Sequence, residues 1–143
     1  MTNSFIIQET ISEQEMAELS SLLNNDQPAH NLLNDKKDIG IFLKNKQGQL
    51  EAGLVGHTFW NWLYIKLLWV HDNKRKEGIG RKLVSEAERI AKERGCLYAW
   101  VDTFSFQAPE FYERLGYEVF GQLDDFPGVN KRVFYRKKIH NNT

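Results

Sequence analysis

The residues best suited to chemistry by type and spacing lie between positions 70 and 82. Five cations stand there against two carboxylates, Asp72 and Glu77, in a chain of 143 residues whose 19 Lys and Arg balance 19 Asp and Glu. The cations are Lys74, Arg75, Lys76, Arg81 and Lys82. Gly78 and Gly80 precede an apolar pattern of helical period, and a helix start with nearby glycines presents open amides to an anion. The segment predicts an anion site, with pyrophosphate as the best fit; a tight turn beside solvated cations is the alternative.

Other familiar sites do not match the sequence. The segment 70–82 lacks the third glycine of a dinucleotide fingerprint and the Gly-Lys-Ser/Thr of a Walker loop. The four His residues lack the spacing of metal ligands, so we expect no metal site. Cys96 opens an apolar run, which is typical of a small buried hydrophobe rather than a nucleophile.

The first half of the chain predicts mainly strands that follow one another as antiparallel neighbours. The expected elements are a strand over 5–7, a helix opened by the capping box Ser12 to Glu15, a loop or short helix over 29–33, and strands over 39–43, 50–60 and 62–71. Gly53 and Gly56 interrupt the strand 50–60 and indicate a bulge or a close backbone approach. The strand 62–71 is rich in apolar residues and is expected to be buried on both faces.

The second half predicts a crossover between parallel strands. Apolar residues from Ile79 trace one helical face, and Gly95 is placed as the stop of that helix. A strand over 96–101 then follows, and the intervening helix makes it parallel to the strand 62–71. The remaining expected elements are a short helix over 109–115 and strands over 117–123 and 132–139. Together these elements predict a mixed α/β sheet.

Length and composition limit the classes to which the protein can belong. A chain of 143 residues favours one domain, 1–143, and its single cysteine argues for a reducing, cytoplasmic setting. No stretch has the length of a membrane span, and the first residues do not resemble a signal peptide, so we expect no membrane partner. A formal charge of zero argues against nucleic acid as a partner. Trp60 and Trp62 could line an acceptor pocket or contact a second copy, which leaves a homodimer open.

Two motifs in the second half resemble one family. Arg75-x-x-Gly78-x-Gly80, between a strand and a long helix, is similar to the acyl-CoA signature of the GNAT N-acetyltransferase superfamily. The run from Ala108 through Tyr112 to Gly116-Tyr117 is similar to a second element of that family, in the expected order. The resemblance implies a GNAT-like mixed sheet of about six or seven strands, with antiparallel N-terminal strands, a splayed parallel pair and flanking helices.

The resemblance also implies acetyl-CoA as co-substrate and assigns residues to it. The backbone of Trp69 and Val70 would pair with the pantetheine arm, and the amides of 75–81 would hold the pyrophosphate. Ser105 stands near the place of a family asparagine that contacts pantetheine. The implied cofactor-binding residues are Trp69, Val70, Arg75, Lys76, Glu77, Gly78, Ile79, Gly80, Arg81, Ser105 and Ala108.

Tyr112 matches the family tyrosine that can protonate the departing thiolate, and it is the expected general acid. The general base is open, because the strand 62–70 lacks the carboxylate that many members carry there. The alternatives are His71, His57, Glu51, Asp102 and a water chain to solvent.

The leading hypothesis is an acetyl-CoA-dependent N-acetyltransferase that moves an acetyl group to a primary amine of a small molecule or peptide by direct transfer in a ternary complex. No convincing Ser-His or Cys-His pair is present, which favours direct attack by the acceptor. One alternative is a non-catalytic CoA-binding or interaction domain of the same fold. Another is a nucleic-acid-binding module that uses the basic residues of 74–82 and 131–138.

Overall fold

The protein is described by a computed structural model over residues 4–26 and 34–140. The chain forms two compact units, residues 1–33 and residues 34–143. The segment 29–33, expected as a loop or short helix, lies outside the described residues. Within the ranges that are described, no helix is long and apolar enough to cross a membrane.

The first unit contains the helix α1 (Glu13–Asp26). Its start is fixed by a reciprocal capping box: the Glu15 N–H donates to the Ser12 hydroxyl (3.0 Å), and the Ser12 N–H donates to the Glu15 carboxylate (3.2 Å). The prediction of this helix start is confirmed. The prediction of a strand over 5–7 is wrong: these residues form no strand in the described structure, and their side chains are exposed. β-type residues make a strand only where a neighbour supplies hydrogen bonds.

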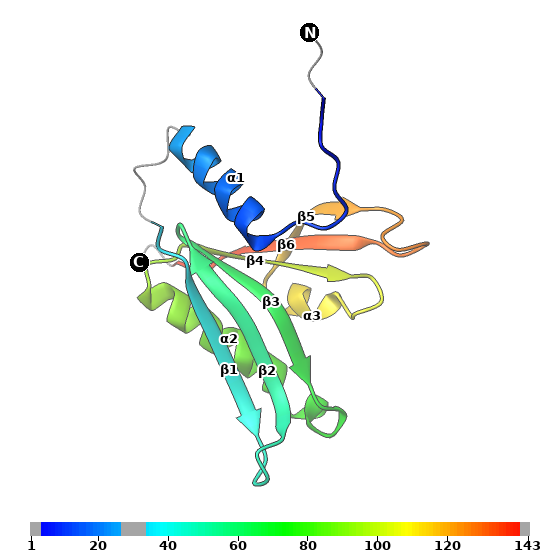
Figure 1. Cartoon of the computed structure of the whole chain (residues 1–143). Helices are drawn as coiled ribbons and strands as arrows, with labels where there is room; N and C mark the ends of the chain where they lie inside the picture. The colour runs from blue at the N-terminus through cyan, green and yellow to red at the C-terminus, as the bar shows by residue number, and fades with distance from the viewer. Residues whose placement is uncertain (1–3, 27–33, 141–143) are drawn as a thin grey trace. The chain divides into compact units, whose positions relative to one another are not determined.

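The second unit is built on a six-stranded sheet in the order β1-β2-β3-β4-β6-β5 (Figure 1). Its strands are β1 (Lys37–Lys44), β2 (Leu50–Phe59), β3 (Trp62–Val70), β4 (Tyr98–Phe104), β5 (Glu118–Leu123) and β6 (Arg132–Lys138). β3 and β4 are parallel, and the other neighbouring strands are antiparallel. The predicted mixed sheet with one central crossover is confirmed.

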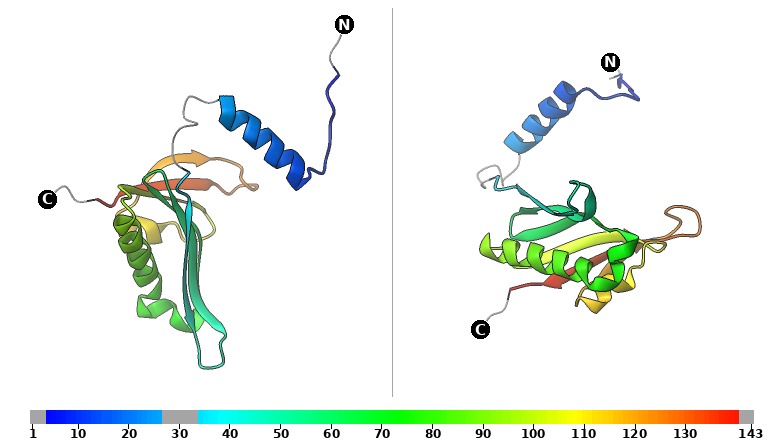
Figure 2. Two further views of the ribbon diagram at one scale, coloured as in Figure 1. Left: turned by 60° about the vertical axis from the view of Figure 1, so that its left-hand side comes forward. Right: turned by 90° about the horizontal axis from the view of Figure 1, so that it is seen from below.

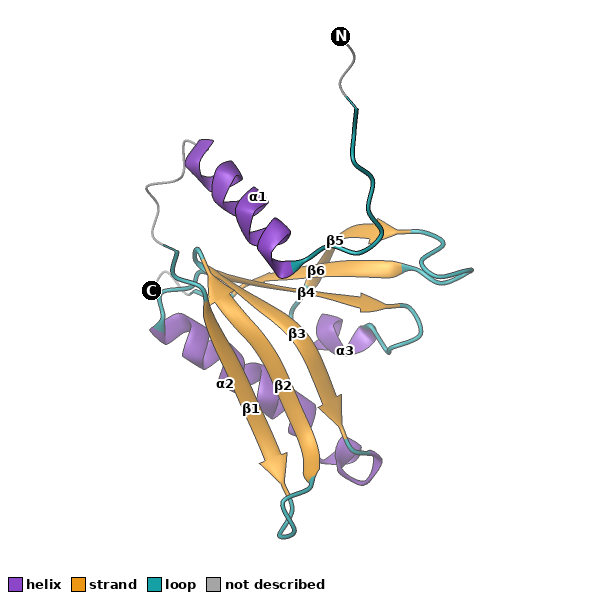
Figure 3. Cartoon of the chain, viewed as in Figure 1, coloured by secondary structure: helices purple, strands orange, loops and turns teal. Residues whose placement is uncertain are grey.

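Helices line one face of this sheet (Figures 2 and 3). The crossover consists of a 3₁₀ helix, η2 (Asp72–Glu77), and then α2 (Ile79–Glu93), which contacts β1, β2 and β3. The short helix α3 (Glu110–Arg114) follows β4. In β2, in β4 and in the first half of β3, every second residue is buried, as the period of a strand requires. The largest fully buried side chains are Leu54, Leu63, Ile65, Val84 and Tyr135.

A β-bulge shapes the middle of β3. Val55 pairs with Leu67 and Gly56 pairs with Ile65, so Lys66 is an extra residue without a partner on β2. A bulge bends its strand and increases its twist. Gly56 is required here, because a Cβ on it would lie 2.2 Å from the Tyr64 carbonyl oxygen. The prediction of a bulge or close approach at this glycine is confirmed.

The parallel pair β3 and β4 separates directly after that point. Their pairing runs only from Trp62–Tyr98 to Ile65–Val101, and beyond it the two strands diverge (Figure 1). The second half of β3 is therefore more exposed than expected: Leu67 keeps 61% and Trp69 47% of its surface. Burial on both faces was the wrong prediction for this half, because its β4 side faces a gap instead of a strand.

Candidate functional site

A cleft with a volume of about 830 Å³ opens where β3 and β4 separate. Most of the residues that the sequence singled out line it: Trp69, Val70, Arg75, Gly78, Gly80, Arg81, Ala108 and Tyr112. Lys76, Glu77, Ile79 and Ser105 do not line it. The residues of 69–81 and 108–112 meet here because the crossover returns α2 to the sheet beside α3.

The backbone of β3 offers hydrogen-bonding groups to this cleft. The His71 N–H donates to the Glu51 carbonyl on β2 (2.7 Å), and successive residues of a strand point their backbone groups to opposite sides. Trp69 therefore points its backbone toward β2, whereas Leu68 and Val70 point theirs toward the cleft. The sequence motifs did not indicate Leu68, because they carry no information on the register of β2 and β3.

Part of that edge is already used by the protein. The Val70 carbonyl accepts a hydrogen bond from Arg75 Nε (2.9 Å), and Arg75 Nη1 also contacts Asp72 Oδ1 at 2.7 Å. Arg75 thus closes the turn between β3 and η2 and is held at the rim of the cleft. Within the described ranges, the Val70 N–H and both backbone groups of Leu68 have no strand partner on this side and could pair with an extended ligand.

The N-terminus of α2 forms the second wall. Gly78 adopts φ of 74°, in the left-handed region that glycine enters freely, and the first helical bond runs from the Lys82 N–H to the Gly78 carbonyl (3.1 Å). No side chain of the described residues caps this end. The open amides of 79–81 and the helix dipole together favour an anion.

Gly80 allows α2 to start close to α3. A Cβ at this position would lie 3.1 Å from Phe111 Cζ and 3.8 Å from Val70 Cγ2. Phe111 lines the same cleft and was not expected there. A helical spacing of apolar residues could have indicated its position, but the 5 residues of α3 are too few to show such a spacing.

Tyr112 lies on α3 with its side chain 7% exposed. Burial, and next the negative charge of Asp102, raise the pKa of Tyr112 to about 12. Its hydroxyl makes no hydrogen bond within the described part of the chain, whereas Tyr117 donates to Glu88 (2.8 Å) and Tyr135 to Glu113 (3.2 Å). Tyr112 is therefore a protonated phenol at neutral pH with its donor uncommitted.

An ion pair between the buried Glu88 and the partly exposed Lys137 holds the elements around this tyrosine. Glu88 of α2 is 8% exposed and accepts hydrogen bonds from Lys137 Nζ (3.0 and 3.1 Å) and from the Tyr117 hydroxyl. The Tyr117 N–H in turn donates to the Tyr112 carbonyl (3.0 Å). This Glu88 cluster joins α2, β6 and the end of α3.

Three of the four side chains considered as general base lie outside the cleft. His71 Nδ1 accepts the Asn73 N–H (3.2 Å), and Glu51 lies 3.5 Å from Lys74 Nζ. His57 packs against the Tyr64 ring, and burial lowers its pKa, with Lys36 as the next cause. Asp102 is the one of the four that lines the cleft.

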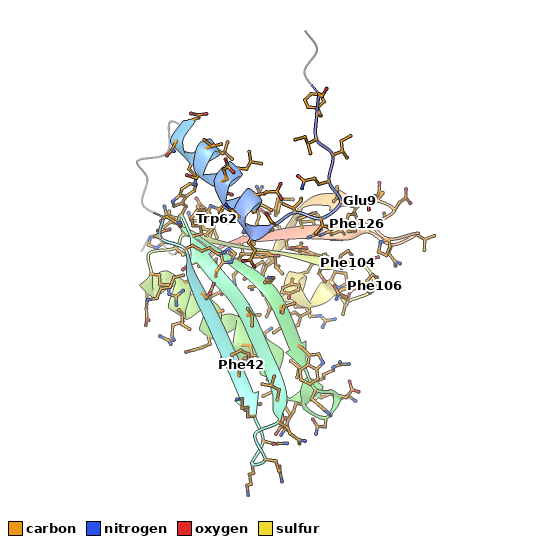
Figure 4. All side chains as sticks on the ribbon, in the orientation of Figure 1. Glu9, Phe42, Trp62, Phe104, Phe106 and Phe126 are labelled. Atoms are coloured by element: carbon orange, nitrogen blue, oxygen red, sulfur yellow. The ribbon has the colours of Figure 1, made fainter. Side chains whose placement is uncertain are left out.

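The loop after β4 places Ser105 elsewhere. Its hydroxyl accepts the Lys131 N–H (3.0 Å) and contacts Asn130 Oδ1 (3.3 Å), so it joins two loops. Gln107 and Ala108 of the same loop do line the cleft, and Ala108 adopts φ of 55°. Figure 4 shows Phe104, Phe106 and Phe126 gathered at this end of β4.

Comparisons with known proteins agree with this geometry. The sequence profile described as "Acetyltransferase (GNAT) family" matches residues 7–117. The chain is 38% identical over 133 residues to an acetyltransferase of Agrobacterium fabrum, which covers 90% of this chain and 97% of that protein. It is 45% identical over 94 residues to blasticidin-S acetyltransferase of Streptomyces morookaense, covering 64% of this chain and 69% of that protein.

A solved structure supports the same likeness. The crystal structure of an acetyltransferase from Bacillus cereus superposes with a TM-score of 0.80 at 31% identity, over 93% of this chain and 97% of that one. The matched regions include β3, α2 and α3, which form the cleft.

Proposed function

Because the chain belongs to the GNAT family of acetyl-CoA-dependent acetyltransferases, we propose that it transfers the acetyl group directly to a primary amine in a ternary complex. The observation that carries this proposal is the separation of β3 from β4 beside an uncapped helix N-terminus. These two features supply one edge for an extended amide-bearing chain and one set of amides for a diphosphate.

The residues present fit acetyl-CoA. The Leu68 backbone and the Val70 N–H would pair with the amides of the pantetheine arm, as an added strand would. The amides of 79–81 would hold the pyrophosphate, with Arg75 and Arg81 at the rim. When bound, acetyl-CoA supplies an acyl group activated as a thioester.

Tyr112 would act as the general acid of the reaction. Its hydroxyl has no hydrogen-bond acceptor within residues 4–26 and 34–140, and its raised pKa keeps the proton in place at neutral pH. It would give that proton to the departing thiolate sulfur and regain one from solvent. Lining by Phe111 and Leu115 would limit water around the sulfur.

Direct transfer is supported by the position of Cys96. This thiol is buried outside the cleft lining, and burial raises its pKa, which makes a thiolate nucleophile less available. An acetylated enzyme intermediate on Cys96 would contradict the proposal; intact-mass measurement after mixing with acetyl-CoA alone would detect it.

A non-catalytic CoA-binding domain is the second candidate, since β3 carries no carboxylate. One experiment separates the two: acetyl-CoA binding by calorimetry, followed by a thiol-release assay on polyamines, aminoglycosides, amino acids, peptide N-termini and blasticidin S. Blasticidin S is included because one relative is named for it. Binding with turnover of at least one amine supports the transferase; binding without turnover on any amine supports the second candidate.

A further inference from the structure

Asp102 occupies the point where the sheet divides. It follows Val101, the last residue of β4 paired with β3, and its own backbone pairs only with Phe134 of β6. Its side chain is 9% exposed and lines the cleft. A carboxylate at this position lies inside the site although no motif of the sequence includes it.

Two side chains hold this carboxylate in one orientation. The Tyr64 hydroxyl donates to Oδ1 (3.0 Å), while Arg132 Nε and Nη2 lie 2.8 and 2.6 Å from Oδ2. The Arg132 guanidinium also lies 5.3 to 5.6 Å from the ring centres of Phe104, Phe126 and Phe134. The Arg132 guanidinium is thereby held by the Asp102 carboxylate on one side and by aromatic rings on the other.

The carboxylate is not saturated by these partners. Two carboxylate oxygens offer about four lone-pair sites, and the three donors leave one on Oδ1. A carboxylate can only accept hydrogen bonds, so a ligand at this site must donate one. A cationic donor gains most, because a charge-assisted hydrogen bond is about twice as strong as a neutral one.

Asp102 and Tyr112 both line the cleft, Asp102 from β4 and Tyr112 from α3. The charge of Asp102 acts on Tyr112 strongly enough to be the second cause of its raised pKa. The two groups thus suit the two ends of the transfer: a donor for the sulfur and an acceptor for the nitrogen.

We propose that Asp102 binds the ammonium group of the acceptor amine, and that Tyr64 and Arg132 are positioning residues for it. This inference rests on the proposed transferase function and narrows its acceptors to amines that are cations at neutral pH. Asp102 orients the nitrogen toward the thioester and remains unchanged in the overall reaction.

The atoms balance without a further reactant. The bound ammonium first releases one proton to solvent, which frees the lone pair on nitrogen. The N–C bond then forms and the C–S bond breaks. Of the two remaining protons on nitrogen, one stays on the amide and the other balances the proton that Tyr112 gives to the CoA sulfur.

The test compares two amines of the same shape and different charge. Phenethylamine is an ammonium ion at pH 7.5, whereas O-benzylhydroxylamine is uncharged. In Asp102→Asn we expect kcat/KM to fall about 10- to 100-fold for phenethylamine, the value of one hydrogen bond to a charged group, and about threefold or less for O-benzylhydroxylamine. Affinity for acetyl-CoA, measured by calorimetry, should not change.

Further variants distinguish a loss of amine binding from a general loss of structure. Asp124→Asn removes an exposed carboxylate whose side chain contacts Gln122, and should leave both amines unaffected. Tyr64→Phe should raise KM for phenethylamine and not for O-benzylhydroxylamine, with kcat kept. If Asp102→Asn does not fold because Arg132 loses its partner, the double variant Asp102→Asn/Arg132→Gln removes both charges and should show the same selectivity.

The outcomes are distinct. An equal loss for both amines, or no loss for either, in a variant that still binds acetyl-CoA would overturn the role of Asp102 and leave the transferase function intact. Absence of thiol release by the wild-type protein with these and all other amines of the panel would overturn both.

Discussion

The carbonyl oxygen of Tyr64 approaches Gly56 so closely that a Cβ on the glycine would lie 2.2 Å from it. This approach occurs at the bulge of β3, one residue before the strand leaves β4. The site therefore depends on a glycine that does not itself line the cleft.

Gly56→Ala should destabilise the protein by about 2–4 kcal/mol, because backbone on both strands must shift. It should also weaken acetyl-CoA binding, since the bulge sets the direction of the second half of β3. Urea unfolding and calorimetry check the two effects. Gly121→Ala is the matched control, as a Cβ there meets nothing within 4 Å; equal unfolding midpoints for both variants would contradict this role of the bulge.

Tyr112→Phe should lower kcat by about 100-fold, the lower range for loss of a general acid, and leave acetyl-CoA affinity unchanged. Its stability should change little, because the hydroxyl has no hydrogen-bond partner among the described residues. Tyr117→Phe provides the contrast: it loses a bond to a buried carboxylate and should cost about 1–3 kcal/mol of stability. Full turnover in Tyr112→Phe would remove the acid assignment.

Alkaline pH should destabilise the fold through the tyrosines near the cleft. The pKa of Tyr112 rises from 10.0 to about 12 on folding, chiefly by burial. Below pH 10 the phenol is protonated in both states; between pH 10 and 12 only the unfolded state loses its proton, so stability falls as pH rises. Burial raises the pKa of Tyr135 to about 12 as well.

Unfolding free energy measured from pH 9 upward should therefore decrease more steeply in the wild type than in Tyr112→Phe. Tyr98→Phe serves as a reference substitution on β4. A slope identical in wild type and Tyr112→Phe would contradict the burial of the phenol.

The Glu88 cluster predicts a compensating pair of variants. Lys137→Met leaves a carboxylate that is 8% exposed without its cation, and should cost roughly 2–4 kcal/mol. Glu88→Gln in the same chain should recover much of that loss, because the unpaired charge is gone. Thermal unfolding of both variants measures this; a double variant less stable than Lys137→Met would show that charge pairing is not the cause.

Gly80→Val should lower acetyl-CoA affinity by about tenfold, or 1.4 kcal/mol. The added side chain must displace Phe111, which lines the cleft beside the first amides of α2. Calorimetry is the direct measurement. Gly95→Asn, at a helix end remote from the cleft lining, tests whether loss of a glycine at a helix terminus alone has this effect; the same fall in affinity there would contradict the assignment.

Much of the site could be predicted because it lies in short local motifs. Arg75, Gly78 and Gly80 are adjacent in sequence, and the helix that follows fixes their common orientation. Tyr112 was predicted from the resemblance of 108–117 to a family motif, and the structure places it in the lining of the cleft.

The remainder depends on contacts between strands that no local pattern encodes. Asp102 meets Tyr64 and Arg132 only through the register of β3, β4 and β6. The cleft-facing side of Leu68 follows from pairing with β2, and the exposure of Leu67 follows from the loss of pairing with β4. An apolar run in the sequence does not indicate whether its neighbour in the fold is another strand or a bound ligand.

Among the residues that the structure describes, four residue pairs join β3 to β4, and this short pairing links the antiparallel group β1-β2-β3 to the group β4-β6-β5. A molecule that pairs with the free edge of β3 would extend this narrow junction. Its binding free energy would then also resist unfolding, adding about 2.7 kcal/mol at a concentration 100 times Kd. The concentration of acetyl-CoA relative to its Kd would thereby contribute to the free energy of unfolding of this junction.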